Sequence, residues 1–445
     1  MLTRKEVHNI KLEKLKRVHM VGISSEFSSF VGTYLLDIGI ELTASEFNQK
    51  HPRSKMWREK GVLYPGGHDA KYITKDLDLV IIPNGPIPGN PECEKAQKLN
   101  LPTVTIGQVL GLISKNFNTI AIAGTHGKTT TSALITWMLY KDYRDLPNFV
   151  IGDEILDINK SYNFNTHSEY LIVEACEYKR QFLDRAPEPY ISVITNVELD
   201  HTDYYKDQDD YNSAFKEFIS NTQYAVVIDS RGKNISKIVK DIDIKIIDCK
   251  DIEEMYEGVT AGLFGDYNHE NVLRACGVAN LLGIYPDIED FPGVRSRFQY
   301  IGRTKNSNEI YLDYAHNPKK VQSCLKAAKE RFKDKRIVFI WQPHNFERSL
   351  TFEEQFANSL NDADVVLIPN IFAHIREKQE FKEKLSDEEF VKYLQNRNPK
   401  KDIKYTKNFK NTVKELKNYD SDSVFVFASA GDLKNIFEMM EIDNA

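Results

Sequence analysis

The segment at residues 124–130, which reads GTHGKTT, combines glycines, a lysine and hydroxyl side chains in the order that a phosphate-binding loop requires. It follows the apolar run 119–123 (TIAIA) and precedes a helical pattern, so backbone N–H groups would converge on one anion. Lys128 can bridge the β- and γ-phosphates of a nucleotide, and Thr129 can offer an oxygen to Mg²⁺. The general pattern has its first glycine where this chain has Ile122, so the loop is a compact variant. A chance turn that caps a helix is the alternative, and the strand–loop–helix context favours nucleotide binding by Gly124, Thr125, His126, Gly127, Lys128, Thr129 and Thr130.

Two further candidates follow strands of the same block. Glu174 ends the apolar run 169–174, and His201 comes after the run 190–195 and a short turn. Open α/β sheets place ligands at the carboxyl ends of their strands, so both side chains are expected near the phosphate loop. A carboxylate there can bind Mg²⁺, whereas histidine is an unusual ligand for a hard cation. Taken alone, Glu174 could equally be a solvated acid at a strand end, and His201 could equally cap a helix. Together they favour a metal site formed by Thr129, Glu174 and His201.

The elements that must position these residues alternate between strand and helix. Strands are predicted at 18–23, 41–44, 77–83 and 102–106, then at 119–123, 169–174 and 190–195, and finally at 309–313, 336–341, 364–369 and 424–428. Helices are predicted over 30–38, over 92–99 and from about residue 130. Such alternation is typical of an α/β fold in which helices cover parallel sheets. The boundaries between the three blocks are predicted near residues 114 and 290.

Composition narrows the class of protein. The chain has 445 residues, 41% hydrophobic and 28% charged, so it can bury several cores and is not disordered. Its 59 basic and 65 acidic residues give no general attraction to nucleic acid or to an anionic membrane. There is no apolar run of about 20 residues and no signal-peptide core at the N-terminus. The five scattered cysteines form no CxxC pair, and we expect a cytoplasmic protein without a disulfide scaffold.

Nine segments, in order along the chain, resemble the Mur ligases, the ATP-dependent amide-forming family of peptidoglycan synthesis. They are AGTHGKTTT (123–131), VEACEY (173–178), ITNVELDHTDYY (194–205), GDYNHENVLRA (265–275), SRFQYIG (296–302), DYAHNP (313–318), WQPHNFERSL (341–350), IFAHIREK (371–378) and ASAGD (428–432). The resemblance implies three domains. They are a Rossmann-like N-terminal domain for a UDP-sugar (1–114), a central phosphate-loop ATPase domain with a mostly parallel sheet (115–290), and a Rossmann-like C-terminal domain that closes and receives the amino acid (291–445).

The resemblance also implies a reaction. ATP and Mg²⁺ would be the cofactors, and the substrates would be small molecules, UDP-N-acetylmuramate and an amino acid, without nucleic-acid or membrane partners. The γ-phosphoryl group of ATP would convert the lactyl carboxylate into an acyl phosphate, which the amine then attacks. Because carboxylate and triphosphate repel each other, Lys128 and Mg²⁺ would act as electrostatic clamps. The segments SRFQ, QPHNFER and AHIREK are most similar to those of the family member that adds the first amino acid, L-alanine.

Roles follow residue by residue from the same resemblance. The catalytic residues would be Lys128, Glu174, His201, His316 and Arg348. In addition to the phosphate loop, three residues would bind the nucleotide: Asn268 would contact the adenine, Arg297 the γ-phosphate and Asp313 the ribose. Of the two Mg²⁺ ions expected in the family, His201 would hold the second. Substrate binding would involve Ser24, Ser25, His68, Asn84, Asn196, Tyr314 and His344.

The sequence departs from the family pattern at a loop and at single positions, among them Tyr267, which replaces a frequent histidine beside Asn268. The N-terminal loop is glycine-rich in the family but reads GISSEFSS at 22–29, and Glu26 would repel a pyrophosphate if it pointed inward. Cys176 stands where an aspartate is common. Asn345 stands where many relatives carry an arginine, which leaves Arg348 to pair with the carboxylate of the amino acid.

Three other functions are open at this point. A ligase that adds a preformed peptide to the same UDP-sugar would need a larger acceptor pocket. A non-catalytic nucleotide-binding regulator would be favoured by the loss of Lys128, Glu174 or His201, and all three are present. A phosphate-loop switch or kinase would not account for the segments DYAHNP and QPHNFER. The oligomeric state is open as well.

Overall fold

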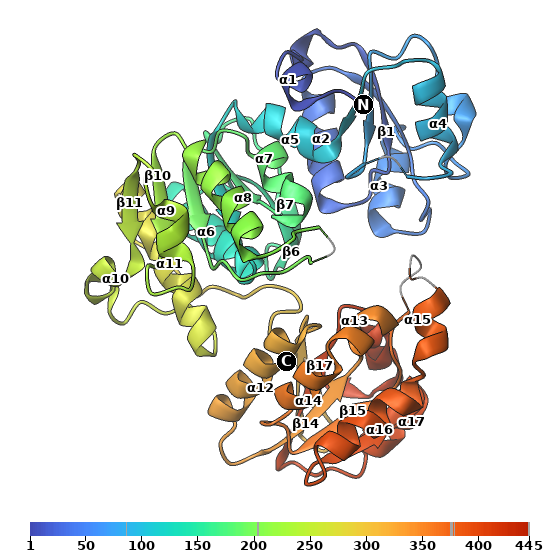
Figure 1. Cartoon of the computed structure of the whole chain (residues 1–445), viewed down its shortest axis with the longest axis vertical. Helices are drawn as coiled ribbons and strands as arrows, with labels where there is room; N and C mark the ends of the chain where they lie inside the picture. The colour runs from blue at the N-terminus through green and yellow to red at the C-terminus, as the bar shows by residue number, and fades with distance from the viewer. Residues whose placement is uncertain (86, 203, 374–376, 378, 444–445) are drawn as a thin grey trace. The chain divides into compact units, whose positions relative to one another are not determined.

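The computed structural model describes residues 1–85, 87–202, 204–373, 377 and 379–443. Residues 374–376 and 378 of the segment IFAHIREK, and Asp203 of the segment ITNVELDHTDYY, lie outside the described residues. The described chain forms three β-sheets, each with helices between its strands (Figure 1). It divides into two compact units, which are considered separately: unit 1 comprises Met1–Gly262 and Glu270–Pro292, and unit 2 comprises Leu263–His269 and Gly293–Ala445.

The first sheet of unit 1 is parallel throughout and has the strand order β2-β1-β3-β4. Its strands are β1 (Arg17–Val21), β2 (Glu41–Ser45), β3 (Leu79–Ile82) and β4 (Thr103–Thr105), and all four were predicted. The helices between and after them are α2 (Glu26–Asp37), α3 (Pro52–Glu59), α4 (Pro91–Lys98) and α5 (Ile106–Ser114). From β1 the chain passes to β2 on one side of β1, and from β2 it crosses to β3 on the other side. The carboxyl end of β1 is therefore a topological switch point, where such sheets bind ligands.

The second sheet of unit 1 has the order β11-β10-β9-β5-β8-β6-β7 and is parallel except for β7. The predicted strands are confirmed as β5 (Asn118–Ala123), β8 (Tyr170–Glu174) and β9 (Ile191–Ile194). Sequence reasoning missed β6 (Asn148–Ile155), β7 (Lys160–Asn163), β10 (Ala225–Ile228) and β11 (Lys245–Asp248). The helices are α6 (Lys128–Tyr143), α7 (Gln181–Arg185), α8 (Gln208–Ser220), α9 (Ile235–Val239), α10 (Cys249–Ile252) and α11 (Asp266–Leu282).

Helices α5 and α7 join the two sheets of unit 1. Gly111 of α5 lies directly against the α7 backbone, where a methyl group would collide with the carbonyl oxygen of Asp184. The guanidinium of Arg185 stacks 4.0 Å from the ring centre of Phe27. The two helices therefore pack backbone against backbone, a contact that only glycine permits.

Unit 2 contains the third sheet, with the order β16-β15-β14-β17-β13-β12-β18. The predicted strands are confirmed as β13 (Glu309–Asp313), β14 (Arg336–Trp341), β15 (Val365–Ile368) and β17 (Ser423–Ala428), whereas β12 (Gln299–Thr304), β16 (Asp402–Tyr405) and β18 (Ile442–Asp443) were missed. Strand β12 is antiparallel to both of its neighbours. The helices are α12 (Pro318–Arg331), α13 (Phe346–Thr351), α14 (Glu353–Ser359), α15 (Gln379–Lys384), α16 (Asp387–Arg397) and α17 (Phe409–Leu416).

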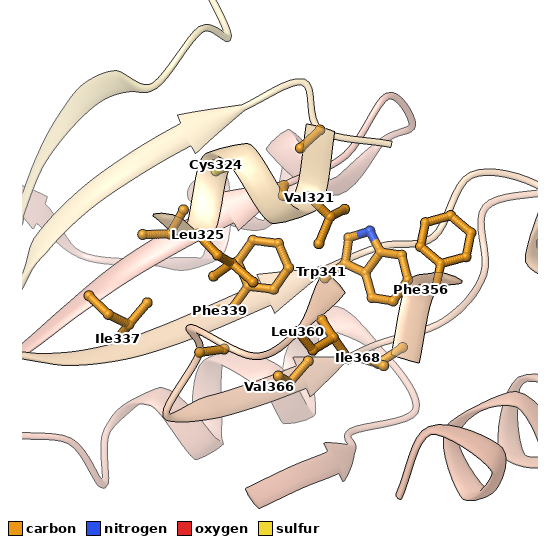
Figure 2. Close-up of a cluster of buried hydrophobic side chains, with 14 of the residues drawn as sticks. Val321, Cys324, Leu325, Ile337, Phe339, Trp341, Phe356, Leu360, Val366 and Ile368 are labelled. Carbon is orange, nitrogen blue, oxygen red and sulfur yellow. The ribbon is translucent and has the colours of Figure 1, made fainter. Parts of the chain in front are cut away.

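A large apolar core holds the third sheet and its helices together (Figure 2). Trp341 and Phe339 of β14 pack there with Val321 and Leu325 of α12 and with Phe356 of α14. These side chains are all less than 2% exposed. Burial of such residues typically contributes about 1.5–3 kcal/mol each, so this core can fix the strand ends that carry the candidate site of unit 2.

The α/β fold class is confirmed, with three mostly parallel sheets in the described chain. The domain boundaries near residues 114 and 290 stay predictions. Over the described residues, the structure contains no helix both long and apolar enough to cross a bilayer.

Candidate active site

The phosphate loop connects β5 to α6, as predicted, and α6 begins at Lys128. Gly127 precedes the helix with a φ of 81°, a left-handed conformation that favours glycine. A methyl group on Gly127 would also collide with the amide oxygen of Asn271. Both the backbone conformation and the lack of space explain why a glycine stands before the lysine.

Asn196, which follows β9, holds this loop in place. Its Oδ1 accepts a hydrogen bond from the backbone N–H of His126 at 2.8 Å, and its Nδ2 donates to the carbonyl oxygen of His126 at 3.1 Å. Thr125 Oγ1 donates to the carbonyl oxygen of Glu198 at 2.8 Å. The structure thus brings Asn196 to the phosphate loop, while its predicted role in substrate binding stays a prediction.

A buried ion pair contains the loop lysine. Lys128 Nζ lies 2.8 Å from Glu177 Oε2, and the two side chains are 12% and 2% exposed. Burial disfavours both charges, but the attraction outweighs it: the pKa of Glu177 falls to about 2 and the pKa of Lys128 rises to about 12. Both groups are therefore charged at neutral pH.

His201 lies on the other oxygen of the same carboxylate. Its Nε2 is 3.3 Å from Glu177 Oε1, and its ring centre is 4.6 Å from that of Tyr178. One buried carboxylate thus joins the phosphate-loop lysine to the histidine predicted to bind metal. Sequence reasoning missed Glu177, although an acidic residue inside the matched segment VEACEY was a signal that could have identified it.

Glu174 and Thr129 come together at the carboxyl edge of the second sheet. Glu174 Oε2 accepts from Thr129 Oγ1 at 2.9 Å and from the backbone N–H of Gly152 at 2.8 Å. Mg²⁺ prefers oxygen ligands and usually binds one or two carboxylates together with phosphate oxygens and waters, so this pair fits it. Among the described residues, no three or more His, Cys, Asp or Glu side chains form a group that could hold a metal ion.

Glu174→Gln is expected to lower activity while leaving stability nearly unchanged. Glutamine keeps the volume and still accepts hydrogen bonds from Thr129 and Gly152, but it removes the charge that would attract Mg²⁺. Phosphate release should partly recover at high Mg²⁺, and the unfolding temperature should move little. Glu169→Gln, at the exposed position just before the same strand, is the matched control. A large fall in unfolding temperature with an unchanged Mg²⁺ dependence would instead make Glu174 a structural residue.

The serine-rich loop after β1 forms its hydrogen bonds within the protein. Ser24 Oγ lies 2.7 Å from Ser54 Oγ, and Ser25 Oγ accepts from the backbone N–H of Ser28 at 3.2 Å as the cap of α2. The backbone N–H groups of Ile23 and Ser24 donate to Glu46 Oε2 at 3.2 and 3.0 Å. The roles of Ser24 and Ser25 in substrate binding stay predictions.

Glu26 has a positively charged partner. Its Oε1 lies 2.9 Å from Arg53, which also donates to the carbonyl oxygen of Ser24 at 2.9 Å. The repulsion that the sequence predicts between Glu26 and a pyrophosphate is therefore offset by Arg53. Of the other residues predicted for this region, His68 lies beside Ser45 at the end of β2, and Asn84 is exposed after β3.

Unit 2 carries a second group of predicted residues around the end of β13. Asp313 Oδ2 accepts from the backbone N–H of Phe298 at 2.9 Å, and burial raises the pKa of Asp313 although Arg297 opposes the shift. The guanidinium of Arg297 lies 4.8 Å from the ring centre of Tyr314. Asn268 is buried and donates to the carbonyl oxygen of Phe264 at 2.7 Å. Asp313, Arg297 and Tyr314 are thus neighbours.

Two histidines and an arginine follow in the same unit. His316 Nδ1 lies 2.7 Å from the carbonyl oxygen of Tyr314, so Nδ1 carries the hydrogen. Burial lowers the pKa of His316 well below 6.5, and the positive charges of Lys320 and Arg348 lower it further. The ring is therefore neutral, with a lone pair on Nε2. The His344 ring centre lies 6.1 Å from that of His316.

The sequence matches three domain families of known proteins. Residues 17–118 match the Mur ligase family, catalytic domain; residues 122–255 match the Mur ligase middle domain; and residues 296–431 match the Mur ligase, glutamate ligase domain. Together these matches extend over most of both units.

Among similar proteins is the UDP-N-acetylmuramate–L-alanine ligase of Caldanaerobacter subterraneus subsp. tengcongensis. It is 33% identical over an alignment that covers 97% of this chain and 98% of the relative. Among solved structures, a UDP-N-acetylmuramate-alanine ligase from Thermotoga maritima is similar with a TM-score of 0.72 and 22% identity, covering 96% of this chain and 98% of the other. A murein peptide ligase from Psychrobacter arcticus is similar with a TM-score of 0.66 and 20% identity, covering 95% and 98%. At these identities the two structures support the fold.

Proposed function

The chain belongs to the Mur ligase family, and we propose that it joins L-alanine to the lactyl carboxylate of UDP-N-acetylmuramate while converting ATP to ADP and phosphate. The observation that carries this proposal is the 33% identity, over nearly the whole chain, to a relative with that name. The phosphate loop and the Thr129–Glu174 pair support the ATP chemistry.

The residues of unit 1 serve the phosphoryl transfer. The loop N–H groups and Lys128 would hold the phosphates while a lactyl oxygen attacks the γ-phosphorus and ADP leaves. Mg²⁺, when bound, would supply further positive charge to the phosphate oxygens. Thr129 and Glu174 offer oxygen ligands for it, and we propose His201 for a second ion. Glu177 would have to release Lys128 to the phosphates for the loop to work.

The residues of unit 2 would receive the amino acid and part of the nucleotide. Arg348 can bind the carboxylate of alanine through two parallel hydrogen bonds. Because His316 is neutral, its Nε2 can accept a hydrogen bond from the ammonium group. Tyr314 and His344 are proposed to line the same place. For the nucleotide we propose that the adenine, the γ-phosphate and the ribose contact, respectively, Asn268, Arg297 and Asp313.

The amide bond then forms without further cofactors. The ammonium group of alanine first gives up one proton to the solvent. The amine nitrogen then attacks the carbonyl carbon of the acyl phosphate, the bond to phosphate breaks, and the departing phosphate takes the second proton from the nitrogen. Water must be kept from the acyl phosphate, since hydrolysis would waste ATP.

The direct test is phosphate release by the purified protein with ATP, Mg²⁺ and UDP-N-acetylmuramate, with each amino acid supplied separately. Release that depends on L-alanine, with formation of the amide product, is expected. Turnover only with a preformed peptide would assign the protein to peptide recycling instead. ATP binding without turnover on any acceptor would identify a regulator.

Arg348→Lys is expected to raise the KM for alanine about tenfold, because lysine keeps the charge but loses the planar fork. Asn345 cannot replace the lost charge pair, since its side-chain amide is uncharged and its Oδ1 caps α13 by accepting from the backbone N–H of Arg348 at 2.8 Å. The KM values for ATP and the UDP-sugar should stay within twofold of the parent. Steady-state kinetics with each substrate varied in turn measure this, with Arg336→Lys, at the exposed start of β14, as the control. A defect confined to the KM for ATP or for the UDP-sugar would contradict the role of Arg348.

A further inference from the structure

Glu92 is a fully buried carboxylate beside the first sheet. It has no part in the functional roles described above. It belongs to the first turn of α4 and contacts the end of β2. Its Oε2 accepts from Ser45 Oγ at 2.6 Å, and its Oε1 accepts from the backbone N–H of Asp69 at 3.0 Å. Burial raises the pKa of Glu92, but the hydrogen bonds outweigh that effect and hold it at about 2. The side chain is therefore a buried anion at neutral pH.

Two histidines flank this anion. His68 Nδ1 lies 2.8 Å from Ser45 Oγ and 3.5 Å from Glu92 Oε2. His19, in the middle of β1, has its Nε2 3.6 Å from Glu92 Oε2 and its Nδ1 2.8 Å from Thr43 Oγ1. The His19 side chain is fully buried, whereas the His68 side chain is 16% exposed. His68 is thus the member of this group that can meet a ligand.

Donor and acceptor chemistry decides which nitrogen of His68 carries the hydrogen. A carboxylate only accepts, so Ser45 must donate its single hydroxyl hydrogen to Glu92. The hydroxyl oxygen then has only lone pairs left for His68, and Nδ1 must donate to it. Nε2 is consequently the atom that His68 can offer to a ligand.

A buried charge is costly and persists only where the groups around it satisfy it. The partners of Glu92 are the Ser45 hydroxyl, the Asp69 backbone N–H and the two histidines, so the carboxylate and its neighbours form one polar group inside the first sheet. A carboxylate that fixes the orientation of a histidine is a recurrent device in functional sites.

We infer that Glu92 is a positioning residue that acts through Ser45 to hold the ring of His68 with Nδ1 inward and Nε2 toward the UDP-sugar. The inference rests on the proposed function and on the prediction that residues 1–114, with His68 among the substrate-binding residues, bind the UDP-sugar. Glu92 itself touches no substrate. Its effect reaches the ligand only through His68.

Kinetics of E92Q test this inference. Glutamine keeps the volume of the side chain but removes the charge that orients Ser45 and His68. The KM for the UDP-sugar should rise about tenfold, while kcat and the KM for ATP stay within twofold. Glu94→Gln, on the exposed side of the same helix, should behave like the parent. In an H68A background, E92Q should cause no further rise, because the residue through which it acts is gone.

A spectroscopic measurement separates positioning from folding. The ¹⁵N shifts of the His68 ring report which nitrogen is protonated, and the free parent protein should show the hydrogen on Nδ1. E92Q removes the acceptor that fixes the direction of the Ser45 hydroxyl and should change this tautomer balance. S45A, which keeps the buried charge, should raise the KM for the UDP-sugar even if E92Q folds poorly. An unchanged KM for the UDP-sugar in S45A, or an equal effect of E92Q with and without His68, would overturn the inference. If the tautomer changes but the parent does not use UDP-N-acetylmuramate, the proposed function fails while the coupling of Glu92 to His68 stands.

Discussion

Lys128→Ala is expected to abolish ligation and to destabilise unit 1 at the same time. Loss of a phosphate clamp should cost on the order of 3 kcal/mol or more in the transition state, which is about a hundredfold or more in rate. The same change leaves the buried carboxylate of Glu177 without its lysine partner. Removing one member of a buried ion pair typically costs about 3–5 kcal/mol of stability, because the other charge is left uncompensated.

A double variant separates these two effects of Lys128→Ala. In Lys128→Ala/Glu177→Gln the orphaned charge is gone, so the unfolding temperature should recover while ligation stays absent. Lys115→Ala is the control, because the pair between Lys115 and Glu188 at 3.0 Å is more exposed and worth about 1 kcal/mol or less. Phosphate release and thermal unfolding measure the outcomes. Turnover of Lys128→Ala at the parent rate would show that ATP binds elsewhere.

Glu177→Gln is expected to lower stability by about 3 kcal/mol while strengthening the binding of ATP. In the free protein, Glu177 and a nucleotide phosphate compete for the same ammonium group, and the variant removes the competitor. Binding to the folded state stabilises it, so ATP should raise the unfolding temperature of the variant more than that of the parent. We also expect kcat to fall, because His201 loses its carboxylate partner.

Calorimetric titration with ATP and thermal unfolding with and without ATP measure these changes, with Glu188→Gln as the control. The difference in the free energy of unfolding between the parent protein and Glu177→Gln should also depend on pH. The folded pKa of Glu177 lies near 2 against an ordinary value of 4.5, so its stabilising contribution is complete above pH 4.5 and is lost as the pH falls toward 2. The gap between parent and variant should narrow over that range. Equal ATP affinity and equal stability in parent and variant would contradict the role given to this ion pair.

Most of the strands that sequence reasoning identified are buried along nearly their whole length, although β10, which is also buried throughout, was missed. Strands β5 and β8 lie side by side in the centre of the second sheet, and their continuous apolar runs are the signal that a buried parallel strand leaves in a sequence. Strand β11, at the edge of that sheet, is half-exposed or exposed along its whole length, and β12 has only one buried position. Such strands lack the continuous apolar run, and their place in the sheet comes from pairing with distant segments.

The candidate site likewise contains residues that could be predicted from the sequence and contacts that could not. The phosphate loop is continuous in sequence, so its glycines, lysine and threonine could be predicted together. The pairing of Glu177 with Lys128 joins positions 49 residues apart and depends on the register between β5 and β8. The contact of Glu26 with Arg53 likewise depends on how α3 packs near the loop after β1. Spacing along the chain carries no information on such contacts.

The close approach of α5 and α7 at Gly111 limits how this chain can be recombined with its relatives. A chimera that takes its first sheet and α5 from another protein brings a new helix surface against the Asp184 carbonyl, where any side chain larger than hydrogen collides. The donor segment must therefore keep a glycine at that position, or the chimera must take α7 from the same donor. A crossover between the first and second sheets leaves each sheet intact but separates α5 from α7. Such a chimera is expected to misfold unless the two helices come from the same protein or a glycine is kept at position 111.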